Sequence, residues 1–123
     1  MCIRDRSCTA ILKNASENKI NIIAKEIFSN GRLTNANKKF HQNELIELVT
    51  IAKSVNLNLE ELSYLWVYQL PFIKICLTGA STITQLDTNL KCIKKKDLEI
   101  PSLESFALST EDYWSTRKLL NWN

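Results

Sequence analysis

The sequence predicts an α/β fold built on a parallel sheet, and three observations support that prediction. Two short apolar runs rich in β-branched residues, 20–25 and 72–77, have the composition of strands that are covered on both faces. Helical periodicity follows each run, first over 44–55 and 59–69 and then over 83–93. Two successive strand–helix units favour parallel strands joined by right-handed crossovers.

Local signals predict the elements in order. Residues 9–18 predict a helix before the first strand. Residues 26–34 predict a loop with Asn-Gly at its turn, and the polar segment 35–43 predicts a surface loop. Asn58 and Glu61 have the spacing of a capping box, which would begin the second helix of the pair.

The C-terminal part predicts two short helices. Ser102 would cap a helix that ends near Leu108, and Ser109 or Thr110 would cap another over 111–120. The apolar side chains of this last helix and of the tail are expected to pack against the rest of the fold: Tyr113, Trp114, Leu119, Leu120 and Trp122.

The turn after the second apolar run, residues 77–82, is the strongest functional signal. Gly79 allows a tight turn or the close approach of a ligand, because it has no Cβ. Ser81 or Thr82 would cap the helix that follows. The remaining N–H groups and the positive end of the helix dipole would then form an anion site.

Composition limits the class of partner. The chain has 123 residues, enough for one domain or a piece of one, and its net charge of +3 is too small to indicate nucleic acid or an anionic membrane. Helices 44–55 and 59–69 also have the outline of a helix-turn-helix, which is a rival interpretation. Against it, the would-be recognition helix carries Glu60 and Glu61 and neither lysine nor arginine, whereas phosphate binding requires cations.

The four cysteines form no C-x-x-C pair and His41 is the single histidine, so no zinc site is predicted. Cys76 and Cys92 are expected to be small core residues, and scattered thiols suit a reducing cytoplasm. No segment has the length and apolarity of a membrane span. Residues 1–7 have no signal-peptide core and resemble translated adapter sequence, so we expect a non-native leader followed by residues 8–123 of a longer natural chain.

Three motifs resemble one enzyme family. The string Leu-Thr-Gly-Ala-Ser-Thr-x-x-Gln-Leu-x-x-Asn-Leu at 77–90 resembles the last barrel strand and following helix of the aldo/keto reductases. Gly-Arg-Leu-Thr at 31–34 resembles the loop after their seventh strand, and the ending Tyr-Trp-x-x-Arg-x-x-Leu-x-Trp-Asn resembles the C-terminus of one branch. The resemblance implies that residues 8–123 form the C-terminal portion of a (β/α)₈ TIM barrel: strands 7 and 8 with their helices, plus C-terminal helices.

The resemblance implies an NAD(P)H-dependent oxidoreductase that reduces a small carbonyl compound, with NADP as cofactor and NAD as the alternative. Ser81 and Gln85 would contact phosphate and ribose, and Asn89 would contact the adenine amine. The cofactor-binding residues implied by the matching motif positions are Glu26, Phe28, Gly31, Leu33, Gly79, Ala80, Ser81, Gln85, Thr88 and Asn89.

Some positions depart from the family pattern. Glu26 stands where relatives have serine beside the pyrophosphate, and its carboxylate would repel a phosphate unless it points into the barrel or pairs with Lys25. Gly79, Ala80 and Gln85 stand where many relatives have Lys, Ser and Arg. The bidentate contact of an arginine to the 2′-phosphate is therefore missing, which leaves the preference for NADP over NAD open.

The family's catalytic Asp, Tyr, Lys and His come from the first half of the barrel, and no part of that half is recognisable in this sequence. We therefore expect the chain to be inactive by itself. An alternative is a reductase-like subunit that binds cofactor without turnover. The sequence specifies neither the carbonyl substrate nor an oligomeric state. Four side chains have no catalytic context: His41, Tyr64, Tyr68 and Tyr113.

Overall fold

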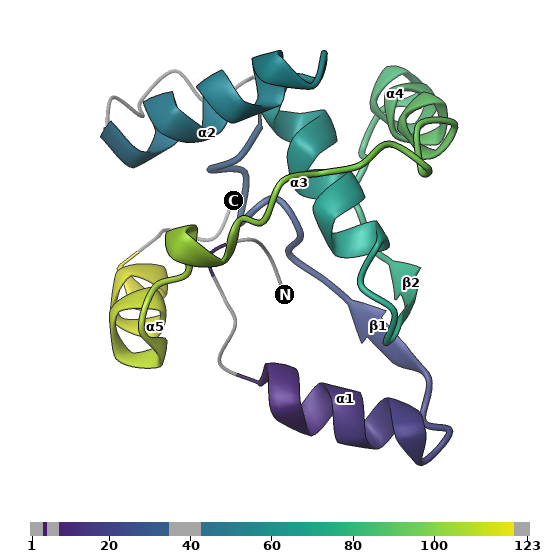
Figure 1. Ribbon diagram of the computed structural model, residues 1–123, viewed down its shortest axis with the longest axis vertical. Coiled ribbons are helices and arrows are strands. Elements are labelled where there is room, and N and C mark those ends of the chain that lie inside the picture. Colours follow the sequence, from purple (N-terminus) through teal and green to yellow (C-terminus); the bar gives the residue numbers. More distant parts are fainter. Residues whose placement is uncertain (1–3, 5–7, 35–42, 120–123) are drawn as a thin grey trace.

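The computed structural model describes Arg4 and residues 8–34 and 43–119. The described chain has a small two-stranded sheet at one side of the molecule, between α1 and α3 in the view of Figure 1. The elements in chain order are α1 (Thr9–Glu17), β1 (Ile22–Ala24), α2 (Asn43–Ser54), α3 (Leu59–Tyr68), β2 (Ile73–Cys76), α4 (Ile83–Ile93), the 3₁₀ helix η1 (Glu104–Phe106) and α5 (Thr110–Lys118).

The sheet consists of β1 and β2, which pair in parallel as the sequence predicts. Ile22 lies opposite Ile73 and Ala24 opposite Cys76, with an irregularity in the register after Ile22. The Leu77 amide extends the pairing by donating to the Ala24 carbonyl at 2.8 Å. The chain passes through α2 and α3 between the two strands, so both strands end at the same edge of the sheet (Figure 1).

The expectation that both faces of the strands are covered is wrong for the described part of the chain. Ile22 and Ala24 are buried, but Ile23 between them is 54% exposed and Ile75 on β2 is 49% exposed. Helix α3 packs against β2. Successive side chains of a strand point to opposite faces of the sheet. One face of β1 is therefore buried, and the side chain of Ile23 lies on the opposite, exposed face.

The core forms around α2, α3 and loop 26–34. Helix α3 buries every side chain from Leu62 to Val67, so it has no free face for a nucleic-acid groove, which argues against the helix-turn-helix interpretation. Its predicted capping box is confirmed: the Glu61 amide donates to Asn58 Oδ1 at 2.9 Å, and the Asn58 amide donates to Glu61 Oε2 at 3.0 Å. Fully buried core side chains are Ile27, Leu33, Leu48, Leu62, Leu65, Val67 and Leu103.

The buried face of helix α4 is not the apolar face that its sequence periodicity predicts to be buried. Ile83, Leu86 and Leu90 are 87%, 50% and 54% exposed, whereas Asn89 and Cys92 are buried. The buried side faces α3, since the Cys92 thiol donates to a backbone carbonyl of α3. An apolar stripe therefore remains exposed on α4 within the described chain.

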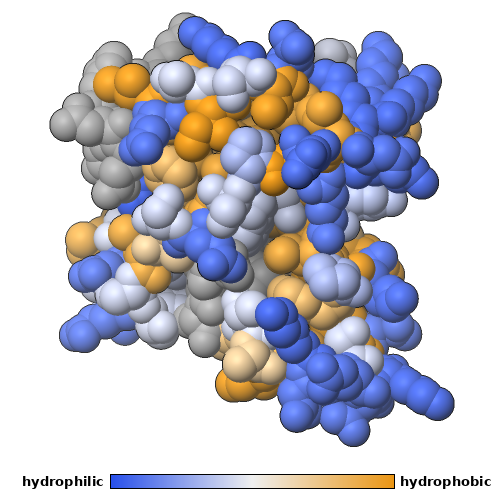
Figure 2. Space-filling model, viewed as in Figure 1, coloured by the Kyte–Doolittle hydropathy of each residue, from blue (hydrophilic) through white to orange (hydrophobic). Residues whose placement is uncertain are grey.

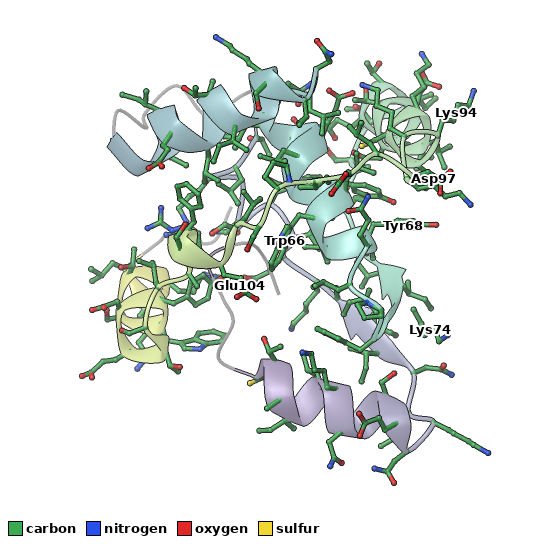
Figure 3. The ribbon with its side chains drawn as sticks, viewed as in Figure 1. Trp66, Tyr68, Lys74, Lys94, Asp97 and Glu104 are labelled. Atoms are coloured by element: carbon green, nitrogen blue, oxygen red, sulfur yellow. The ribbon has the colours of Figure 1, made fainter. Side chains whose placement is uncertain are left out.

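The lysines after α4 are exposed, as expected for a solvated helix end. Figure 3 shows Lys94 and Asp97 pointing away from the body of the molecule. Lys95 donates to Glu61 Oε1 at 2.7 Å and so ties the end of α4 to the start of α3. Hydrophilic residues gather over this end of α4 in Figure 2.

The terminal helices differ in part from the predictions. Helix α1 buries no residue. Instead of a helix capped by Ser102, the structure has the single 3₁₀ turn η1, with no side-chain cap. Helix α5 begins at its predicted cap, with the Ser109 hydroxyl accepting from the Asp112 amide at 3.1 Å. Tyr113 is buried as expected, but Trp114 and Leu119 are 46% and 85% exposed, and Leu120 and Trp122 lie outside the described residues.

Two remaining predictions concern segments that the structure describes only in part. The predicted surface loop 35–43, which includes His41, lies outside the described residues except for Asn43. The non-native leader at residues 1–7 stays a prediction; of these residues the structure describes Arg4, which is buried and whose carbonyl accepts from the Leu108 amide at 3.0 Å. No described helix could span a membrane, and no described cluster of His, Cys, Asp or Glu could hold a metal ion.

Candidate functional site

A pocket of about 320 Å³ lies where the chain leaves the carboxyl ends of β1 and β2. Ligands of open α/β sheets bind at this edge, because the loops after neighbouring parallel strands meet there. The lining comes from loop 26–34, from the turn at 77–80, from the first turn of α3 and from the first two turns of α4. The lining residues are Glu26, Ile27, Phe28, Asn30, Gly31, Thr34, Glu60, Leu77, Thr78, Gly79, Ala80, Gln85 and Asn89.

Loop 26–34 makes a tight turn through left-handed backbone. Ser29, Asn30 and Gly31 follow one another with φ of 53°, 56° and 78°. The Leu33 amide closes the turn by donating to the Phe28 carbonyl at 3.0 Å. The amides of Asn30 and Gly31 donate to no group within the described residues. Consecutive free amides in such a turn form a concavity that favours anions.

The turn after β2 brings a second set of backbone groups to the pocket. Gly79 has a φ of 66°, a conformation that glycine adopts without strain, and a Cβ built there would contact nothing within 4 Å. Gly79 and Ala80 line the pocket, and their amides donate to no group in the part of the chain that the structure describes. The backbone here is therefore open to a ligand.

The start of α4 is capped from within. Thr82 is the cap: its hydroxyl accepts from the Gln85 amide at 3.2 Å. Gln85 Oε1 in turn accepts from the Ser81 amide at 2.9 Å and from the Ser81 hydroxyl at 3.1 Å. These bonds occupy the carbonyl of Gln85 and the polar groups of Ser81, so the Nε2 amide of Gln85 is the group left to donate to a ligand.

Asn89 is the buried polar side chain of the pocket. It is 6% exposed, lines the pocket, and makes no side-chain hydrogen bond with the described residues. The polar atoms of its amide are not fully buried, so they can form hydrogen bonds to water or to a polar ligand. Its neighbour Thr88 is exposed, and the Thr88 hydroxyl donates to the Thr84 carbonyl at 2.9 Å.

Most of the residues that the sequence singles out come together in this pocket. Those that line it are Glu26, Phe28, Gly31, Gly79, Ala80, Gln85 and Asn89. Leu33, Ser81 and Thr88 do not line it: Leu33 is fully buried in the core, Ser81 supports the cap, and Thr88 faces solvent.

The structure adds lining residues that the sequence analysis does not select. Ile27, Asn30, Thr34, Leu77 and Thr78 are sequence neighbours of selected residues, so the loop boundaries already contain the signal for them. Glu60 has no such signal. It lies in the first turn of α3, and only the packing of α3 against α4 and β2 brings it to the pocket.

The Glu26 carboxylate pairs with Arg117, a partner that the sequence does not indicate, and it also lies in the electrostatic field of the neighbouring Lys25. Arg117 donates from Nε to Glu26 Oε2 at 3.1 Å and from Nη2 to Glu26 Oε1 at 2.9 Å. These hydrogen bonds hold the pKa of Glu26 below its usual value, although partial burial of the carboxyl opposes them. Arg117 thus contacts a residue of the pocket wall.

The described lining contains no cysteine, serine, histidine, tyrosine or lysine, and its ionisable groups are the carboxyls of Glu26 and Glu60. Burial raises the pKa of the Tyr64 hydroxyl to about 12 and that of the Cys92 thiol to about 11, which keeps both groups protonated. Neither lines the pocket, and neither do Tyr68 and Tyr113. The described lining can therefore bind and orient a polar, anionic ligand.

Comparisons with known proteins point to one family. The model of the aldo/keto reductase family matches residues 1–107. Among solved structures, the chain is similar to the aldo-keto reductase AKR11C1 from Bacillus halodurans, in its holo form with a TM-score of 0.63 and in its apo form with a TM-score of 0.61. Each match is 18% identical and covers 98% of this chain but 41% of the other, so the likeness concerns the fold. No curated protein matches this chain.

Proposed function

This chain belongs to the aldo/keto reductase family, and from that premise we propose that it is the nucleotide-holding part of an NAD(P)H-dependent oxidoreductase. In this proposal β1 and β2 are the seventh and eighth strands of a (β/α)₈ barrel, and the pocket at their carboxyl ends receives the cofactor. The whole protein would act on a small carbonyl compound, and the chain spans 41% of the length of the solved relatives.

The observation that supports this proposal is the supply of unused hydrogen-bonding groups in one pocket. The backbone amides of Asn30, Gly31, Gly79 and Ala80, which have no partner within the described residues, can donate to phosphate oxygens. The side chain of Asn89 offers both a donor and an acceptor to an adenine edge. These groups fit a dinucleotide, which carries phosphates at one place and a planar base at another.

A bound nicotinamide cofactor would supply the hydride for reduction of the carbonyl group. The residues of this chain would hold the phosphates and the base, and so fix where the nicotinamide lies. Proton transfer would come from groups outside these 123 residues. We accordingly propose that the chain alone binds cofactor without turnover.

Selectivity between NADP and NAD is part of the proposal. NADP is the cofactor that the family resemblance implies, and Gln85 Nε2 could donate to its 2′-phosphate. Among the described lining residues none is a lysine or an arginine, so that phosphate would meet neutral donors. We therefore propose that both nucleotides bind, with a modest preference for NADP.

The test is titration of the chain with NADPH and NADH, followed by the fluorescence of the reduced nicotinamide. Asn89→Ala should weaken binding by about 0.5–3 kcal/mol, the range for hydrogen bonds of neutral and charged partners. Thr88→Ala is the matched control, because Thr88 is the next residue on α4 but faces solvent. Unchanged affinity in Asn89→Ala, or an equal loss in both variants, would contradict the proposed position of the adenine.

A further inference from the structure

The wall of the pocket carries a negative charge at the place where a phosphate would bind. Glu26 begins the loop that contains Asn30 and Gly31, and all three residues line the pocket. No lysine or arginine is among the lining residues that the structure describes. A carboxylate beside a phosphate is repulsive, and the repulsion is only partly screened by salt at such a short distance. A pocket for phosphate therefore needs a cation that compensates Glu26.

Arg117 supplies that cation from outside the lining. Arg117 lies 91 residues after Glu26 in the sequence, and its guanidinium donates two hydrogen bonds, of 3.1 Å and 2.9 Å, to the Glu26 carboxylate. The Arg117 side chain is 6% exposed and that of Glu26 30% exposed, so the pair is better shielded from solvent than a surface ion pair. Planar, two-point pairing of this kind fixes the direction of the carboxylate as well as its charge.

Helix α5 holds the same loop at a second point. Tyr113 lies one helical turn before Arg117, so both side chains project from the same face of α5. The Arg32 guanidinium lies 5.7 Å from the centre of the Tyr113 ring, and Arg32 Nε donates to the Ser29 carbonyl at 3.0 Å. The helix therefore contacts the loop at both ends of its left-handed turn.

We infer that Arg117 is a positioning residue of the nucleotide pocket, which turns and neutralises the Glu26 carboxylate so that loop 26–34 accepts a phosphate. This inference rests on the proposed function. It assigns a role to α5, whose residues Thr110–Lys118 lie beyond the segment 1–107 matched by the family model. It also accounts for a glutamate at a position where the family pattern has serine.

The experiment compares a phosphate-bearing ligand with a neutral one. NADPH and adenosine are titrated into the chain and into Arg117→Ala. Loss of the guanidinium leaves an uncompensated carboxylate, so the NADPH affinity should fall at least about fivefold, while the adenosine affinity stays within about twofold. Lys118→Ala is the matched control: it removes a cation from the adjacent, exposed position of α5, and both affinities should stay unchanged.

Two further variants separate charge compensation from support of the loop. In Arg117→Ala/Glu26→Gln the carboxylate that Arg117 compensates is gone and Glu60 is unchanged, so NADPH affinity should return to within about twofold of the original chain. Arg117→Lys keeps the positive charge but cannot form the bidentate hydrogen bonds to Glu26. Its NADPH affinity should therefore lie between those of Arg117→Ala and the original chain. Glu26→Gln alone keeps α5 intact and should bind NADPH at least as tightly as the original chain, which tests the inference even if Arg117→Ala does not fold.

Each outcome bears on one of the two proposals. If the original chain binds NADPH but Arg117→Ala binds it equally well, the inference is wrong and the proposed function stands. If Arg117→Ala loses adenosine and NADPH affinity alike, or if the double variant does not recover, Arg117 only supports the loop and the inference is again wrong. If the original chain binds neither ligand, the proposed function fails and the inference fails with it.

Discussion

Single residues of the site depend on backbone conformations that most side chains avoid. Gly31 and Gly79 have positive φ, and so do Glu26, Ser29 and Asn30 in the loop after β1. An L residue in this region is strained by contact between its Cβ and the backbone, and glycine is not. The glycines therefore hold the turns around the pocket at low cost.

Gly79→Ala should lower the free energy of unfolding by about 1 kcal/mol, because alanine is strained at this φ although its Cβ would contact nothing within 4 Å. Asn30→Gly is the opposite change at a similar φ of 56°, and it should not destabilise the chain. Urea unfolding followed by circular dichroism measures both. If the free energy of unfolding of Gly79→Ala equals that of the original chain, the turn adopts another backbone conformation at residue 79.

At the scale of elements, the start of α3 is the junction that sets the geometry near Glu60. The Asn58–Glu61 capping box fixes the first turn of α3, and the same Glu61 carboxylate accepts from Lys95 after α4. The cap satisfies helix amides that otherwise have no partner, whereas the ion pair is partly exposed, with 43% of the Lys95 side chain accessible. We expect the cap to contribute more stability than the ion pair.

Asn58→Ala should cost about 1 kcal/mol of unfolding free energy, the usual value for loss of an N-cap. Lys95→Met keeps the apolar stem and removes the charge, and it should cost less than about 1 kcal/mol. The two variants are compared by urea unfolding at one ionic strength. A larger loss of unfolding free energy in Lys95→Met than in Asn58→Ala would show that the ion pair contributes more stability than the cap.

For the whole molecule, the notable property is the apolar surface left uncovered in the described chain. On the sheet, Ile23, Ile75 and Leu77 are each about half exposed, and Ile83, Leu86 and Leu90 form a stripe along α4. The two strands also have outer edges with no partner strand in the described chain. Exposed apolar patches and open strand edges promote association.

The purified chain should therefore associate as its concentration rises, and sedimentation velocity would show the weight-average mass increasing. Leu86→Gln/Leu90→Gln interrupts the stripe on α4 and should reduce the association. Leu119→Gln is the control, since Leu119 is 85% exposed at the C-cap of α5 and is not part of that stripe. A monomer at all concentrations would contradict the prediction.

Much of the fold was predictable because its signals are local. The capping box at Asn58 and Glu61, the cap at Ser109 and the turn at Gly79 each depend on residues within about four positions of one another. The β-branched runs likewise predict β1 and β2, and the helices between them make parallel pairing the simplest topology. The motifs at 31–34 and 77–90 also identify the family before any tertiary contact is known.

The arrangement of the site was decided by tertiary structure. Thr88 and Asn89 are neighbours of similar polarity, and only the rotation of α4 against α3 places Asn89 in the pocket and Thr88 in solvent. Glu26 meets Arg117, 91 residues away, because loop 26–34 and α5 pack together. Sequence patterns report propensities over a few residues, whereas contacts between distant residues depend on how whole surfaces fit, and a periodic pattern such as that of α4 does not state which surface covers it.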